Sequence, residues 1–89
     1  MMKKEERHQK SEEFRAQIKF PAQRAEAIRS LISKEKFDEV DQLRISILFN
    51  KVSNASGCEQ EYKQLIVRLY DDSDLREKAS DFYKRWNAK

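Results

Sequence analysis

The chain of 89 residues contains one glycine, Gly57, and one proline, Pro21. An average chain of this length has about six glycines and four prolines. Sheets with many tight turns depend on glycine, and proline interrupts helices, so this sequence favours long helical segments joined by few turns. We therefore expect a mainly helical fold, and the length leaves room for one compact domain.

Charge and hydropathy indicate a thin core. Charged residues make up 39% of the chain and hydrophobic residues 38%, so a single copy has little apolar surface to bury. Lys and Arg exceed Asp and Glu by 19 to 16. Residues 1–21 hold six basic and four acidic residues, so part of this excess lies near the N-terminus. This distribution is a weak pointer to a polyanionic partner.

The residue types that carry chemistry are scarce. Cys58 is the single cysteine and His8 the single histidine, so the chain lacks the parts of an internal disulfide, a metal site or a His-based catalytic relay. We expect a non-enzymatic protein without metal or cofactor. The longest apolar run, residues 47–49, is far too short to cross a bilayer, so we expect no membrane segment and a cytoplasmic location.

The N-terminal third has two parts. Residues 1–13 contain almost no apolar side chains after the methionines, which predicts a mobile charged arm. Residues 14–20 then alternate between apolar and polar side chains, which predicts a short strand ended by Pro21. From residue 22 the apolar spacing changes to three and four, which predicts a helix to about residue 35.

The next segment, capped by Asp38, is apolar around more than half of its circumference. Its two stripes consist of Val40, Leu43, Ile47 and Leu48, and of Ile45, Phe49 and Val52. One chain of this size would leave one stripe exposed, so we expect a homodimer. Residues 57–87 repeat the helical spacing twice, which predicts a C-terminal helical hairpin packed on the same domain. Its aromatic residues Tyr62, Tyr83 and Trp86 suit either the core or a protein-binding face.

The order of strand, proline, helix and capped helix over residues 14–50 resembles the ribbon-helix-helix DNA-binding family, which includes the Arc and methionine repressors. In that family, two chains pair their strands and insert one strand face into the major groove of DNA. The resemblance implies a dimeric core over residues 14–52 and places Arg15, Gln17 and Lys19 against the bases. Arg and Lys match the acceptors of guanine, and Gln matches adenine. Lys3 and Lys4 would hold phosphates from the arm.

Two departures from the family pattern keep other interpretations open. The second helix begins Asp38-Glu39-Val40-Asp41, where carboxylates would repel a DNA phosphate, and the usual glycine between the helices is absent. The alternative fold is an all-helical bundle. The sequence thus predicts sequence-specific binding of double-stranded DNA as a small transcriptional regulator or a plasmid or phage maintenance factor. The alternative is a helical adaptor or inhibitor that binds another protein.

Overall fold

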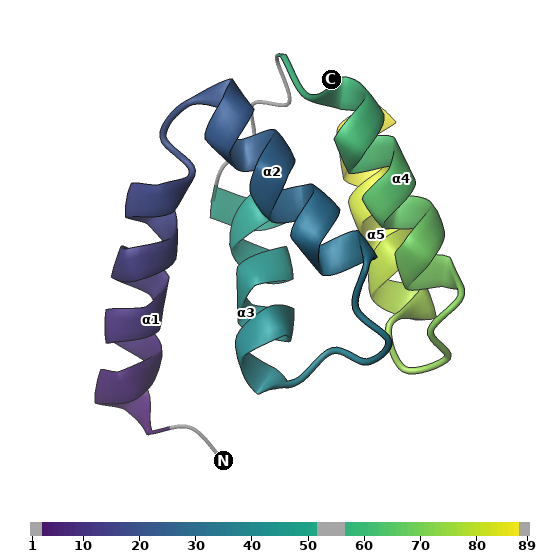
Figure 1. Cartoon of the computed structure of the whole chain (residues 1–89). Coiled ribbons are helices and arrows are strands. Elements are labelled where there is room, and N and C mark those ends of the chain that lie inside the picture. Colours follow the sequence, from purple (N-terminus) through teal and green to yellow (C-terminus); the bar gives the residue numbers. More distant parts are fainter. Residues whose placement is uncertain (1–2, 52–56, 88–89) are drawn as a thin grey trace.

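The computed structural model describes residues 3–51 and 57–87, which are mainly helical and contain no strand. The helices are α1 (Lys4–Gln17), α2 (Pro21–Ile32), α3 (Glu39–Ser46), its π-helical continuation η1 (Ile47–Lys51), α4 (Glu59–Tyr70) and α5 (Arg76–Asn87). In Figure 1, α1 and α3 lie side by side, α2 crosses between α3 and α4, and α5 runs behind α4 in the opposite direction. The predicted mainly helical class is confirmed, in its all-helical form.

The predicted strand over residues 14–20 is wrong. Residues 14–17 complete the last turn of α1, and residues 18–20 form the turn into α2. Of the alternating apolar residues, Phe14 and Ile18 are buried, whereas Phe20 is 64% exposed. Residues four apart share one side of a helix, so a helix buries this pair as well as a strand would. The described residues therefore contain no ribbon of the ribbon-helix-helix type.

The segment expected to be a mobile arm is helical from residue 4 onwards. Its side chains are almost all exposed, so its helical structure depends on local interactions more than on burial. Arg15 pairs with Glu12 at 3.2 Å, and the Gln9 side chain donates to Glu13 at 3.4 Å. Such pairs at spacings of three and four residues stabilise a helix by a few tenths of a kcal/mol each. Phe14 and Ile18 anchor its C-terminal end on the core.

The centre of the molecule is the helix formed by α3 and η1. Asp38 caps its N-terminus as predicted, accepting a hydrogen bond from the Asp41 backbone N–H at 2.8 Å. Both apolar stripes are covered within one chain, and their buried members are Leu43, Ile45, Ile47 and Leu48. The partly buried ring of Phe49 stacks on Phe82 at 4.5 Å between centroids. The reason for expecting a dimer therefore does not apply to these positions; Val52 lies outside the described residues.

Helix α4 packs against α2 and α5 (Figure 1), and Tyr62 of α4 and Phe82 of α5 both contact the Phe49 ring of η1. The buried sides of α4 and α5, with the turn between them, carry the apolar residues that the sequence spacing indicates: Tyr62, Leu65, Ile66, Leu69, Leu75, Ala79 and Phe82. At the connection, the Arg76 Nε donates to the carbonyl oxygen of Tyr70 at 2.9 Å. The two helices therefore meet closely at this end.

Gly57, two residues before α4, packs closely against Pro21 at the start of α2. Its φ is +87°, a backbone conformation that side chains disfavour. A Cβ atom added there would lie 2.9 Å from the Cβ of Pro21, which is closer than real Cβ contacts. The single glycine and the single proline of the chain thus meet at one contact between two helices.

Candidate interaction surfaces

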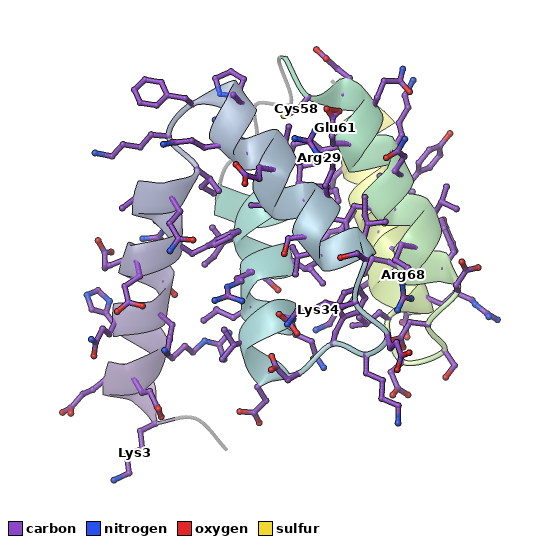
Figure 2. The ribbon with its side chains drawn as sticks, in the orientation of Figure 1. Lys3, Arg29, Lys34, Cys58, Glu61 and Arg68 are labelled. Carbon is purple, nitrogen blue, oxygen red and sulfur yellow. The ribbon has the colours of Figure 1, made fainter. Side chains whose placement is uncertain are left out.

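The residues predicted to bind DNA are all exposed, but they do not share one face. Lys3 and Lys4 lie at the start of α1, whereas Arg15 and Gln17 lie at its other end, roughly 20 Å away at 1.5 Å per residue. Figure 2 shows Lys3 at the far end of α1 from the turn into α2. Arg15 and Gln17 are two residues apart in a helix and so point to opposite sides. The base-reading face requires a strand that the described residues do not form.

Gln17 instead lines a surface hollow of about 370 Å³ between the end of α1 and the outer side of α2. We call it the α2 hollow, and its lining residues are Gln17, Gln23, Glu26, Ala27 and Ser30. The backbone N–H of Phe20 donates to the Gln23 Oε1 at 3.3 Å, which holds Phe20 beside the hollow. Lys19, the preceding residue, is exposed. This hollow has no signal in the sequence, because its lining is mostly polar and follows no motif.

The three aromatic residues predicted for a partner have different positions. Tyr62 is buried, and its hydroxyl donates to the carbonyl oxygen of Leu48 at 3.0 Å, so it belongs to the core. Burial raises the pKa of this hydroxyl. Tyr83 is 48% exposed and available for contact. The side chain of Trp86 lies outside the described part of the structure.

Two further exposed apolar side chains lie on α4. Tyr70 is one of the C-terminal aromatic residues that suit the core or a protein-binding face, whereas Val67 was not singled out from the sequence. Val67 is 62% exposed and Tyr70 is 36% exposed. The signal that identifies them is their position off the buried stripe of α4. Val67, for example, is two residues from the buried Leu65 and so faces the opposite side of the helix.

An ion cluster fixes the start of α3. The Lys34 Nζ lies 2.8 and 2.9 Å from the two carboxylate oxygens of Asp41, which is 1% exposed, and Arg44 lies 3.4 Å from one of them. Burial opposes ionisation of Asp41. However, hydrogen bonds from Lys34 and the Asp38 backbone hold the pKa of this carboxyl below its ordinary value. These charges satisfy one another, so the cluster is structural.

Arg68 connects α4 to the loop between α2 and α3. Its Nη2 donates to the carbonyl oxygens of Lys34 and Glu35, each at 2.9 Å, and its guanidinium lies 4.8 Å from the centre of the Phe37 ring. Figure 2 shows Arg68 reaching from α4 towards the end of α2, where Lys34 lies. The guanidinium thus provides hydrogen bonds to two backbone carbonyl groups of the loop after α2. Arg68 therefore has a structural role, linking α4 to this loop.

Cys58 immediately precedes α4, and its thiol lies near Arg24 of α2 and Glu61 of α4. Burial raises the pKa of its thiol, and the neighbouring Arg24 partly opposes this. Arg24 is itself buried and donates to the carbonyl oxygen of Ile18 at 3.3 Å. Because the thiolate is the reactive form, a buried thiol with a raised pKa is a poor nucleophile. Cys58 is therefore a core residue.

Within residues 3–51 and 57–87, no three His, Cys, Asp or Glu side chains come together as a metal site would require. Nor does any helix there combine the length and apolarity needed to cross a bilayer. Comparisons of the chain with protein-family models, with curated proteins and with solved structures return no match. Its function is therefore inferred from its own exposed surfaces.

Proposed function

We propose that the chain is a non-enzymatic helical module that binds another protein through the outer side of the α4–α5 hairpin. The observation that carries this proposal is the distribution of exposed large apolar side chains. Among the described residues there are four, and three of them, Val67, Tyr70 and Tyr83, belong to this hairpin. Single exposed apolar residues are ordinary, but a group of them on one pair of helices is typical of a binding site.

Helical spacing places the three side chains along the same seam. Val67 and Tyr70 are three residues apart on α4 and therefore lie on one side of it. Tyr83 is seven residues, or about two turns, from Arg76 and therefore lies on the same side of α5. Because Arg76 reaches the backbone of Tyr70, that side of α5 borders α4. The seam thus presents one aliphatic and two aromatic side chains to solvent.

The chemistry of this seam suits a protein partner. Tyrosine supplies a large contact area with a polar tip, and it is enriched among the residues that dominate binding energy. The surrounding exposed positions on the two helices include Lys63, Gln64 and Lys84, which can form the polar rim of such a contact. An apolar centre with a polar rim favours another folded protein or helix over a polyanion.

Site-specific photo-cross-linking tests the proposal. A photoreactive amino acid is placed at Val67 or Tyr83 in cells, with Asp81 as the matched control, because Asp81 is exposed on the opposite side of α5. We expect a discrete cross-linked product from positions 67 and 83 and none from position 81. The partner, once identified and purified, should lose binding at least tenfold with Val67→Glu and be unaffected by Asp81→Lys. Identical products at all three positions, or none, would contradict the proposal.

Binding of double-stranded DNA stays a prediction, and a mobility-shift assay at low salt separates it from the proposed function. Protein binding through the seam predicts no retained complex with duplex DNA. Specific retention that is lost in Arg15→Ala and unchanged in Val67→Glu would favour the DNA-binding hypothesis and overturn the proposal. Arg15 suits this comparison because it is exposed and far from the hairpin core.

A further inference from the structure

Phe20 stands out among the apolar side chains because it is 64% exposed, the highest value for a large apolar residue in the described chain. It precedes Pro21 at the start of α2 and, unlike the buried Phe14 and Ile18 just before it, is not part of the hydrophobic core. An exposed phenyl ring gains no burial energy within its own chain. Its position therefore favours contact with a second surface.

The α2 hollow lies beside this ring. Gln23, Ala27 and Ser30 are spaced by four and three residues along α2 and share its outer side. Ala27 and Ser30 are small, which lets another chain approach closely. A cavity of roughly 150 Å³ accommodates a benzene ring, and the hollow measures about 370 Å³. The hollow is thus large enough to receive a phenyl ring. Phe20 of the same chain does not fill it, because that ring is mostly exposed.

We propose that a second copy of this chain occupies the α2 hollow, with Phe20 of each copy inserted into the hollow of the other. A two-fold contact requires the projecting group and its receiving site on the same surface patch. Residues 17–30 supply both. The inference does not depend on the proposed function, because that function uses a different surface, formed by α4 and α5.

Charge complementarity supports a second copy as the occupant. Glu26 lines the hollow, and Lys19 precedes the projecting Phe20; both are exposed. Neither forms a salt bridge within the described residues. When Phe20 enters the hollow of the other copy, Lys19 approaches Glu26 of that copy, and the two-fold axis generates the same pair again. The patch therefore matches itself in both shape and charge.

Sedimentation velocity over roughly 1 to 500 µM tests this dimer, a range that suits a contact of limited area. We expect the mass to rise from 10.7 kDa towards twice that value as the concentration increases. Phe20→Ser should remain monomeric with an unchanged thermal unfolding curve, since the side chain is exposed. Lys19→Glu should weaken dimerisation at least tenfold, and adding Glu26→Lys to that variant should restore it.

Val67→Glu is the matched control, because it alters the hairpin seam and should leave the dimer unchanged. A dimer lost in Val67→Glu and kept in Phe20→Ser would assign self-association to the seam and overturn the proposal. A mass of 10.7 kDa at every concentration would also overturn it, without affecting the binding of another protein at the seam. Failure of the double charge reversal to restore the dimer would refute the two-fold arrangement.

Discussion

Replacing Asp41 by Asn perturbs the most deeply buried charge among the described residues. The carboxylate is 1% exposed and accepts two hydrogen bonds from the Lys34 ammonium, at 2.8 and 2.9 Å. It also accepts the Asp38 backbone N–H at 3.1 Å, so it secures the first turn of α3. The amide of Asn keeps the shape of this side chain but loses its charge and one of its two acceptor atoms.

The expected cost follows from these contacts. A hydrogen bond to a charged group contributes about 1.5 to 3 kcal/mol, and the variant loses at least one. The Lys34 side chain is 40% exposed and can return to water, which keeps the cost below that of a stranded buried charge. We therefore expect Asp41→Asn to lower the free energy of unfolding by about 2 to 3 kcal/mol. With a urea dependence near 1 kcal/mol per M, the midpoint falls by about 2 to 3 M.

Urea unfolding followed by circular dichroism measures this loss, and its pH dependence tests the cause. The pKa of Asp41 is lowered in the folded state, so its contribution is fully present above the unfolded-state value of about 3.9 and is lost as the pH falls through the folded value. The difference between wild type and Asp41→Asn should therefore be constant near pH 7 and shrink below pH 4. Asp81→Asn, at an exposed position, is the control. A loss under 0.5 kcal/mol at pH 7, or a difference that grows in acid, would refute the reasoning.

Three further predictions concern single residues. Gly57→Ala should cost about 1 to 3 kcal/mol by urea unfolding, because φ is +87° and the new Cβ meets Pro21; an unchanged midpoint would contradict the contact. Tyr62→Phe should cost about 1 to 2 kcal/mol, because it keeps the ring and leaves the Leu48 carbonyl without that donor; a neutral result would mean that the bond is not formed. Cys58 should resist alkylation in the folded chain. Because its pKa is raised, stability should fall as the pH rises above about 8.5, and Cys58→Ala should remove this decline up to about pH 10, where Tyr62 begins to contribute.

Helical spacing predicted the central and C-terminal parts of this fold from sequence. Asp38 has a short acceptor side chain before an apolar stripe, and it caps α3 as expected. Leu65 and Leu69 have the spacing of a buried helix face and are fully buried. These signals come from residues close together in the sequence, so they can be recognised without knowledge of the tertiary contacts.

The N-terminal region was mispredicted because two periodicities coincide there. Phe14 and Ile18 satisfy both an alternating strand pattern and a four-residue helix spacing. The segment before them has few apolar residues, so its helical structure, supported by pairs such as Glu12 with Arg15, left no periodic signal. The dimer stays a prediction. The reason given for it, the apolar circumference of the helix after Asp38, did not take into account that Tyr62 of α4 and Phe82 of α5 pack on η1 within the same chain.

The candidate surfaces were harder to predict than the core. Tyr83 was identified because aromatic residues at helical spacing suit an interface, and it is exposed. Tyr62 has the same spacing but faces η1, where its hydroxyl finds the Leu48 carbonyl. Spacing identifies the buried stripe of a helix, but it does not tell which of the aromatic residues on that stripe remains exposed. The α2 hollow likewise arises from the angle between α1 and α2.

Backbone ¹³Cα chemical shifts of residues 10–20 test the central claim of this account, that one chain closes its core with helices and without a ribbon. The account predicts helical shifts that continue through Gln17 and stop at the turn before Pro21. They should persist at concentrations where the protein is monomeric. Extended shifts over residues 14–20, with cross-strand contacts to a second chain, would contradict the account and support the ribbon-helix-helix prediction.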